Sequence, residues 1–422
     1  MIRHYAHTLW AFARARYLNA RLRDRQAIER HHARQLDRLM AERLPRFPYY
    51  EEHLTSGFSN LPIVDKAELM ANFERCNLGG FSAQYVREAL AEKRDNEDSL
   101  FFGQSTGTSG NRGYYVISEK ERYIWLGTIL AKTLPDALWR KHRVVVALPG
   151  MSTLYSSANS GSRIKLAFFD TADGMHTWEE DLVRFDPDTI VSSPKVLRYL
   201  AERGKLRASN IFSGAEVLDP FDKELIEAAT GAKVREIYMA TEGLFGVSCP
   251  HGHLHLAEDV VHFEWEEAAP GSTLKKPIVT DFTRSSQAMV RYRMNDLLEL
   301  SDEACPCGSA FQRVNAVHGR ADDCFVLPAH SGKSITVTPD VIRNSLIDAY
   351  ADLTDFRAIQ TGKDSVRVEL PPSVCAEKGA QIERGLAAAF ERLGASANIK
   401  TVGGITPLAS KKLRRVSREW RG

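Results

Sequence analysis

The chain has 422 residues, more than one ordinary hydrophobic core holds, so two or three domains are expected. Hydrophobic residues make up 43% and charged residues 26%, as in a soluble globular protein, and a formal net charge of +2 argues against a dedicated nucleic-acid binder. Four of the six cysteines are scattered along the chain, which excludes a disulfide framework and favours a reduced, cytoplasmic setting.

The basic residues gather toward the two ends of the chain. Residues 1–46 contain eleven Arg against four acidic residues, and the tail from Lys411 holds six Lys and Arg against Glu419. Such surfaces suit an acidic or phosphate-rich partner. No run of 18 apolar residues and no secretory signal is present, so neither a membrane span nor secretion is expected.

The first predicted element is a helix over residues 8–44, which ends at Leu44-Pro45. From about residue 115, short apolar runs alternate with helical stretches and Gly- or Ser-bearing turns. This alternation predicts an α/β fold with an at least partly parallel sheet, whose ligands bind beyond the carboxyl ends of the strands. The predicted strands cover residues 144–148, 167–170, 189–194, 210–214 and 236–240, and the predicted helices cover residues 195–203 and 219–230.

After residue 255 the pattern shifts toward strands, such as residues 260–265 and 297–300. Gly319 to Asp323 form a polar stretch that would serve as a linker. The remaining residues carry their own strand at 366–370 and their own helix at 376–393. We therefore expect a large domain over residues 1–320 and a small α+β domain over residues 321–422.

The segment Ser105 to Gly113 is the most informative part of the chain. Its three glycines let backbone N–H groups approach an anion, its hydroxyls add further donors, and Arg112 adds a permanent positive charge. Such a loop suits a polyphosphate, although its spacing differs from the G-x-x-x-x-G-K-[ST] loop. The alternative is an ordinary surface turn.

Two acidic residues follow strand-like segments. Glu242, beside Thr241, comes at the end of the last strand of the α/β region, where a carboxylate and a hydroxyl can bind Mg²⁺ that bridges phosphates. Asp296, after residues 290–295, could accept hydrogen bonds from two ribose hydroxyls. The alternative for Glu242 is a helix start or a turn. The alternative for Asp296 is an Asx-turn or a cap.

Cysteines and histidines of two further segments could form a metal site. Cys305 and Cys307 flank a proline before Gly308, and Cys249 is followed by three histidines. Together they can supply a tetrahedral Cys₃His zinc site without an open position, which would be structural rather than catalytic. Packed cysteines and surface histidines are the alternative. The candidate histidines are His251, His253 and His255.

In this order, the motifs resemble those of the adenylate-forming superfamily, which includes acyl-CoA synthetases and firefly luciferase. The resemblance runs from about residue 30 to the end and is closest to the phenylacetate–CoA ligase branch. Within that branch it is closest to relatives of the synthetase that adenylylates a deazaflavin coenzyme in methanogens. The shared phrases are Ala-Thr-Glu-Gly, Leu-His-Leu-Ala-Glu-Asp, Val-Arg-Tyr-Arg-Met-Asn-Asp and Cys-Pro-Cys-Gly, and Gly319 to Asp322 complete the order.

The resemblance implies a multi-lobed large domain with mixed and parallel sheets, a zinc-bearing lobe near residues 249–307, and a small mobile α+β domain. It implies that the phosphate loop holds the β- and γ-phosphates, that Thr241 contacts the α-phosphate, and that Asp296 binds the ribose with help from Arg320. Residues 213–216 and Tyr238 would enclose the adenine. The implied ATP- or AMP-binding residues are Ser105, Thr106, Gly107, Thr108, Ser109, Gly110, Ser213, Gly214, Ala215, Glu216, Tyr238, Met239, Thr241, Asp296 and Arg320.

The resemblance also implies the remaining roles. Ser410 to Val416 resemble the branch's Gly-Lys-x-x-Arg-Val ending, which favours Lys412 as the catalytic lysine, with Lys411 as the alternative. Asp322 would be the hinge of the small domain. Branch members carry a structural zinc, and the Cys-x₅-His spacing favours His255 as its imidazole ligand. The implied catalytic residues are Lys412, Glu242, Thr241 and Arg320, and the implied metal ligands are Glu242 for Mg²⁺ and Cys249, His255, Cys305 and Cys307 for Zn²⁺.

The function implied is ATP-dependent adenylation of a carboxylic acid, with analogy favouring an aromatic one, followed by transfer of the acyl group to a thiol. The thiol would belong to coenzyme A or to the phosphopantetheine of an acyl carrier protein. The alternatives are transfer of AMP to a phenolic cofactor or other acceptor, with AMP retained on the product, and a non-catalytic nucleotide-binding protein. No nucleic-acid partner is expected, and a homodimer is compatible with the sequence.

Overall fold

The computed structural model describes residues 2–105, 113–149, 163–269, 271–353, 355–405 and 414–421. The chain forms two compact units. The first consists of Met1–Glu266, Pro277–Met294 and Leu300–Asn315, and the second of Glu267–Lys276, Asn295–Glu299 and Ala316–Gly422. The chain therefore passes from one unit to the other several times before residue 316. The domain boundary near residue 320 stays a prediction.

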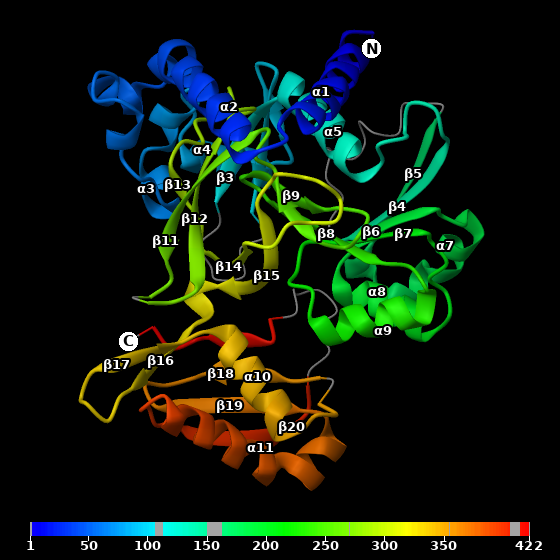
Figure 1. Cartoon of the computed structure of the whole chain (residues 1–422), viewed down its shortest axis with the longest axis vertical. Coiled ribbons are helices and arrows are strands. Elements are labelled where there is room, and N and C mark those ends of the chain that lie inside the picture. Colours follow the sequence, from blue (N-terminus) through cyan, green and yellow to red (C-terminus); the bar gives the residue numbers. More distant parts are fainter. Residues whose placement is uncertain are drawn as a thin grey trace. The chain divides into compact units, whose positions relative to one another are not determined.

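The first unit contains a parallel sheet, whose strands β4 to β7 lie at the right of Figure 1. Its strands lie in the order β5-β4-β6-β7-β8, and every neighbouring pair is parallel. An antiparallel strand, β9, follows β8 across a tight turn. This confirms the α/β prediction and the partly parallel sheet. The strand bounds are β4 His142–Leu148, β5 Ile164–Asp170, β6 Thr189–Ser192, β7 Asn210–Ser213, β8 Val234–Ala240 and β9 Gly243–Ser248.

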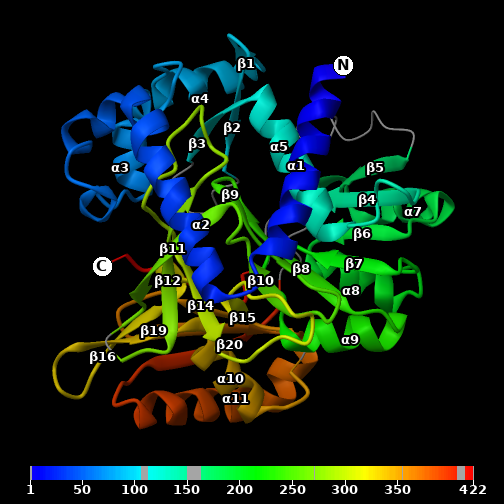
Figure 2. The ribbon, with the colours of Figure 1, turned by 45° about the horizontal axis from the view of Figure 1, so that its top comes forward.

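Helices cover both faces of this sheet because successive side chains of a buried strand point to opposite sides. In β4, Val145 and Ala147 pack in a core with α7 (Glu179–Phe185), α8 (Pro194–Glu202) and α9 (Pro220–Thr230). Val144 and Val146 of the same strand pack instead with α1 (Ile2–Arg21) and α5 (Glu119–Thr133). Figures 1 and 2 show α8 and α9 on one face and α5, with α1 beside it, on the other.

Of the remaining elements of the first unit, β10 continues this sheet beyond β9, β13 pairs with β12 of the same sheet, and the others lie outside it. They include a three-stranded antiparallel sheet in the order β1-β2-β3. The helices are α2 (Arg25–Arg38), α3 (Lys66–Ala71) and α4 (Ala83–Ala91), and the strands are β1 (Asn96–Glu97), β2 (Leu100–Gln104), β3 (Tyr114–Ser118), β10 (Leu254–Leu256) and β13 (Tyr292–Arg293). Strands β11 (Val261–Glu267), β12 (Leu274–Asp281), β14 (Asp296–Ser301) and β15 (Arg313–Arg320) have residues in both units.

The single helix predicted over residues 8–44 is wrong, because the chain breaks between α1 and α2. The Asp24 carboxylate accepts a hydrogen bond from the Ala27 N–H at 2.7 Å and so caps a new helix instead of continuing the first. After α2 the backbone forms a π-helical turn over Leu39–Arg43. The physical reason is local: an aspartate side chain competes for the backbone N–H groups at a helix start.

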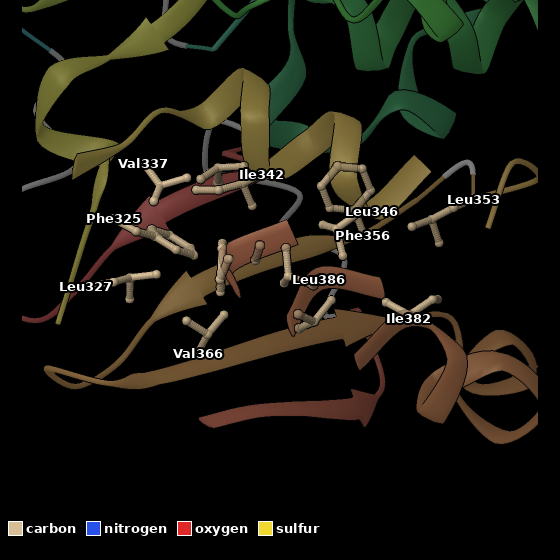
Figure 3. Packing of buried hydrophobic residues seen from close by; sticks show 14 of the residues in the cluster. Phe325, Leu327, Val337, Ile342, Leu346, Leu353, Phe356, Val366, Ile382 and Leu386 are labelled. Carbon is tan, nitrogen blue, oxygen red and sulfur yellow. The ribbon is translucent and has the colours of Figure 1, made fainter. Parts of the chain in front are cut away.

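The second unit has its own sheet, in the order β20-β19-β18-β21, and its own core. Figure 3 shows buried side chains of this core, with Phe325, Ile342 and Leu386 among them, lying between helices and strands. The predicted strand at 366–370 and helix at 376–393 are confirmed as β19 and α11, although the helix begins earlier. The bounds are β16 Phe325–Pro328, β17 Ser334–Val337, α10 Pro339–Ala349, β18 Arg357–Gln360, β19 Ser365–Leu370, α11 Pro372–Arg392, β20 Asn398–Gly403 and β21 Val416–Arg418.

The segment predicted as a linker is more ordered than expected. Gly319 and Arg320 end strand β15, and Ala321–Asp323 form a 3₁₀ turn. The Ala321 N–H donates to the Asn295 carbonyl oxygen at 2.8 Å, which holds this turn beside the start of β14. Among the described residues, none of the helices combines the length and the apolar character that a bilayer crossing demands.

Candidate functional site

The predicted phosphate loop connects the antiparallel strands β2 and β3, and its two ends pair with each other. The Ser105 N–H donates to the Gly113 carbonyl at 2.7 Å, and the Gly113 N–H donates to Ser105 Oγ at 2.8 Å. A Cβ on Gly113 would lie 3.0 Å from Cε of Lys66, so a lysine side chain of α3 lies beside the end of this loop. Thr106, Gly107, Thr108, Ser109 and Gly110 lie outside the described residues.

Two other predicted segments meet at one edge of the parallel sheet. Ser213 ends β7 and residues 214–216 follow it, whereas residues 238–240 end β8 and residues 241–242 form the turn after it; the two strands are adjacent and parallel. Ser213 is buried, and its Oγ has no hydrogen-bond partner among the described residues. Ala215 has a φ of +66°, a conformation that non-glycine residues rarely adopt. The predicted adenine-binding segments thus form one surface at the carboxyl ends of the strands.

Glu242 lies in the turn between β8 and β9 and is oriented by two hydroxyl groups. Thr241 Oγ1 donates to Glu242 Oε2 at 2.8 Å, and the Tyr292 hydroxyl donates to Oε1 at 3.2 Å. A carboxylate oxygen can accept more than one interaction, so each oxygen keeps acceptor capacity for a cation. The carboxylate predicted to hold Mg²⁺ is therefore fixed in direction by its neighbours.

A second carboxylate lies next to this turn. A Cβ on Gly243 would lie 2.8 Å from Asp281 Oδ2, so only glycine lets the Asp281 carboxylate approach the backbone here. The other oxygen of Asp281 accepts from the N–H and hydroxyl of Thr283 at 2.6 and 2.7 Å. Burial raises the pKa of Asp281, and the hydrogen bonds from Thr283 oppose that shift.

The second unit carries the predicted ribose and hinge residues. The sequence predicts that Asp296 comes just after a strand; in the structure it follows the short strand β13 and is the first residue of β14. Arg320 is the last residue of β15. Asp322, in the following 3₁₀ turn, is exposed, whereas Asp323 is buried and forms a two-pronged ion pair with Arg414. Arg414 is thus held next to the predicted hinge. Lys411 and Lys412 lie outside the described residues.

The four predicted zinc ligands are brought together in the first unit. The ligand atoms of Cys249, His255, Cys305 and Cys307 all lie within 4.8 Å of one another. The Cys249 and Cys305 sulfurs are 3.8 Å apart, and Cys307 Sγ lies 3.5 Å from His255 Nε2. Burial, together with the neighbouring cysteine sulfurs, raises the pKa of Cys307 to about 12.

The geometry also shows which of the three candidate histidines lies with the cysteines as a possible metal ligand. His255 is buried, and its Nδ1 lies 2.9 Å from the Phe311 carbonyl oxygen, so the ring can donate from Nδ1 and keep Nε2 for a metal. His253 Nδ1 lies 3.3 Å from Cys305 Sγ but is not one of the four clustered ligands, and His251 is exposed. A closed set of three thiols and one imidazole is the donor set of a structural zinc site.

The acids that follow His255 attach other elements to this region. The Glu258 carboxylate pairs with Arg25 of α2 at 2.8 Å and accepts from the Gln312 N–H at 2.6 Å. Asp259 is fully buried and pairs with Lys132 of α5 at 2.7 Å. The end of the Leu-His-Leu-Ala-Glu-Asp phrase therefore has a structural role.

The structure is similar to a crystal structure of 2-hydroxyisobutyryl-CoA ligase in the postadenylation state, in complex with 2-HIB-AMP. The TM-score is 0.64 with 20% identity, and the match covers 93% of this chain and 89% of that one. This is the fold of the adenylate-forming superfamily.

The match to two other proteins with the adenylate-forming fold covers a smaller share of their chains. ATP-bound MatB from Rhodopseudomonas palustris has a TM-score of 0.51 at 16% identity, covering 72% of this chain and 64% of that one. An anthranilate CoA ligase in complex with anthranoyl-AMP has a TM-score of 0.52 at 14% identity, covering 74% and 65%. No family model matches the chain.

One curated protein is similar in sequence over part of the chain. It is a phenylacetate-coenzyme A ligase from Thermus thermophilus, 27% identical over an aligned length of 161 residues. The match spans 34% of this chain and 36% of the relative, so it covers about a third of the relative's length.

Three residues beside the predicted site were missed by the sequence analysis. Tyr292 belongs to the phrase Val-Arg-Tyr-Arg-Met-Asn-Asp, so its place in a shared motif was the available signal. Asp281 and Lys66 belong to no motif quoted above. Lys66 lies beside Gly113 and Asp281 lies beside Gly243, in each case from a segment far away in sequence. A pattern of neighbouring residues does not reveal such contacts.

Proposed function

We propose that this chain is an ATP-dependent adenylate-forming ligase of the acid–thiol type. The observation that carries this proposal is the Glu242 carboxylate, placed at the carboxyl edge of the sheet and oriented by Thr241 and Tyr292. The fold and the partial sequence similarity to a phenylacetate-coenzyme A ligase support the same reaction class.

The proposed reaction has two steps. A substrate carboxylate attacks the α-phosphorus of ATP, a carbon–oxygen–phosphorus linkage forms, and pyrophosphate leaves. A thiol then attacks the acyl carbon of the acyl-AMP, a thioester forms, and AMP leaves. Both attacking groups approach an anion, so the site must neutralise charge and hold the reactants in line.

The chain's residues would divide this work. Glu242 would hold Mg²⁺, whose charge offsets that of the phosphates, and Thr241 would contact the α-phosphate. The segments 213–216 and 238–239 would enclose the adenine. On the second unit, Asp296 and Arg320 would bind the ribose, Lys412 or Lys411 would supply the ammonium, and Asp322 would act as the hinge of the small domain at residues 321–422.

The acid is proposed to be aromatic, by analogy with the branch that the sequence resembles. Proteins that share the fold are named for different acids, 2-hydroxyisobutyrate in one and anthranilate in another, so the fold alone does not select the acid. The acceptor is proposed to be the thiol of coenzyme A or of a carrier-protein phosphopantetheine.

Pyrophosphate exchange into ATP, measured across a panel of aryl and alkyl acids, tests the proposal. We expect exchange with at least one aryl acid and a loss of about 100-fold or more in Glu242→Gln, because an amide oxygen lacks the negative charge that a carboxylate brings to Mg²⁺. Glu224→Gln is the matched control, since Glu224 is an exposed carboxylate on α9. No exchange with any acid contradicts the proposal.

Product analysis separates the alternatives. Mass spectrometry should find AMP released and a thioester formed when coenzyme A or a carrier protein is added. AMP retained on a phenolic acceptor would indicate nucleotidyl transfer instead. ATP binding without turnover, unaltered in Glu242→Ala, would indicate a non-catalytic nucleotide-binding protein.

We also propose that Cys249, His255, Cys305 and Cys307 hold a structural Zn²⁺. A tetrahedral ion with Zn–S bonds of about 2.3 Å and a Zn–N bond of about 2.0–2.1 Å separates two sulfurs by about 3.8 Å and sulfur from nitrogen by about 3.6 Å. The distances of 3.8 Å between Cys249 and Cys305 and 3.5 Å between Cys307 and His255 fit these values.

Elemental analysis of the purified protein tests the zinc proposal. We expect one zinc per chain, lost in Cys307→Ser and His255→Ala but kept in His253→Ala and His251→Ala. Cys375→Ser is the matched control, because Cys375 is a free thiol of the second unit. Protein purified without chelators that holds no zinc would contradict the proposal, as would equal loss in the control.

A further inference from the structure

A basic cavity opens at the amino-terminal edge of the parallel sheet in the first unit. Its volume is about 620 Å³, and its walls come from the starts of β4 and β5 and the end of α7. Six of its lining residues carry the argument: Lys141, Arg143, Arg163, Lys165, Arg184 and Phe185.

This cavity is separate from the candidate nucleotide residues of the same unit. Ser213 ends β7 and Glu242 comes directly after the carboxyl end of β8, whereas the cavity lies at the opposite ends of parallel strands. Strand β4 has seven residues, which at about 3.3 Å per residue separates the two edges by roughly 20 Å. A ligand in the cavity therefore does not share the edge proposed to bind ATP.

Positive charge dominates the lining. The lining contains five cationic side chains and one carboxylate, that of Asp181, which pairs with Arg184 at 2.8 Å. Lys141 and Lys165 pair with no carboxylate of the described residues, and Arg143 lies 3.5 Å from Asp186. Clustered cations around a concave surface repel one another and raise the local concentration of anions, so a bound anion would relieve this repulsion.

Two lining residues at the start of β4, His142 and Arg143, are held by neighbouring carboxylates. The His142 side chain is only 2% exposed, and its two ring nitrogens lie 3.1 Å from carboxylate oxygens of Asp136 and Asp188. Asp188 also accepts the Arg143 N–H at 2.7 Å, and the Arg143 guanidinium lies 5.3 Å from the centre of the Phe185 ring. The start of β4 and one of the five cations are thus positioned before any ligand binds.

We propose that this cavity binds a small polyphosphate anion, a class that includes inorganic pyrophosphate and nucleoside diphosphates. Its volume falls within the range of about 300–1,000 Å³ that is typical of small-molecule pockets. Guanidinium groups recognise phosphate oxygens with two parallel hydrogen bonds, and the ammonium groups add point charges. Five cations suit a ligand with more than one phosphate better than a single phosphate.

The concave shape favours a small ligand over a macromolecule. An acidic protein surface would need exposed aromatic anchors at the centre of the contact, whereas the lining ring here, Phe185, lies beneath Arg143. The site therefore points to a ligand whose recognition is mainly electrostatic, with affinity that falls as ionic strength rises.

Calorimetric titration with inorganic pyrophosphate, combined with hydrogen exchange, tests the proposal on the full chain. We expect slower exchange in peptides that cover residues 139–147 and 179–187. The triple variant Arg163→Gln, Lys165→Gln, Arg184→Gln should lose this protection, and its Kd for pyrophosphate at this site should rise at least tenfold. The matched control, Arg16→Gln, Arg30→Gln, Arg34→Gln, removes the same charge from exposed positions of α1 and α2 and should retain both.

The localised readout separates this site from any pyrophosphate binding at the proposed ATP site. Protection confined to peptides around residues 213–216 and 238–242 would overturn the inference, as would equal weakening in the control variant. Inorganic phosphate that binds as tightly as pyrophosphate would contradict the polyphosphate class. An acidic peptide such as polyglutamate that displaces pyrophosphate at equal charge concentration would indicate a protein partner instead, and would also overturn it.

Discussion

Replacing Lys132 with methionine should isolate a buried carboxylate and destabilise the first unit strongly. Asp259 is fully buried, and its Oδ1 accepts from Lys132 Nζ at 2.7 Å, with the lysine side chain 15% exposed. Asp259 Oδ2 has no hydrogen-bond partner among the described residues. Methionine has a similar volume but no charge, so the carboxylate would lose its cation without gaining water. We expect a cost of about 3–5 kcal/mol in the free energy of unfolding.

A double-mutant cycle isolates the interaction from the other effects of each change. Asp259→Asn should cost less, about 1–3 kcal/mol, because the partly exposed ammonium of Lys132 can turn toward water. The double variant should therefore cost clearly less than the sum of the two single variants. The matched control is Lys233→Met, which breaks a pair of the same 2.7 Å length with Glu227. The Lys233 side chain is 64% exposed, so the expected cost there is below about 1 kcal/mol.

Urea unfolding at pH 7, followed by circular dichroism and tryptophan fluorescence, measures these differences. The denaturant slope of each variant must match that of the parent, so that a shifted midpoint reports stability. The reasoning is refuted if Lys132→Met lowers the free energy of unfolding by no more than Lys233→Met does. A coupling energy of zero between Lys132 and Asp259 would refute it equally.

Three further changes follow from other contacts. Burial lowers the pKa of His262 to about 4, so between pH 6.5 and 4 only the unfolded chain binds a proton at this residue, and the free energy of unfolding should fall by up to about 3 kcal/mol as pH drops across this range. His262→Gln should flatten the slope of urea midpoint against pH, and an unchanged slope would contradict this prediction. Gly127→Ala should cost about 1–3 kcal/mol despite better helix propensity, because its Cβ would lie 2.2 Å from a backbone oxygen of α1; faster proteolysis within α1 would confirm this, and an unchanged cleavage rate would contradict it. Tyr292→Phe removes a hydrogen bond to Glu242, so under the proposed function we expect a several-fold lower kcat and a higher Mg²⁺ requirement, with unchanged urea midpoint; unaltered kinetics would show that Glu242 needs no such support.

Local patterns in the sequence predict the alternating strands and helices of the fold and the order of the motifs. Apolar runs such as residues 144–148, alternating with helical stretches, predict buried strands of a partly parallel sheet, because a strand covered on both faces reads as a continuous apolar run. Cys305, Cys307 and Cys249 with its following histidines predict a Cys₃His set, the resemblance favours His255, and the structure brings these four residues together. The strands could be predicted because each depends on a few neighbouring residues, whereas the cluster was predicted from its residue types and the resemblance, since its two segments lie more than 50 residues apart.

Which distant side chains come into contact depends on the tertiary structure. Tyr292 reaches Glu242, and Asp281 approaches Gly243, through the pairing and order of strands that no local pattern specifies. The same holds for the basic cavity, whose cations come from three separate segments. A side chain's neighbours depend on register and on which strands lie side by side, because a shift of one residue turns every side chain to the other face of the sheet.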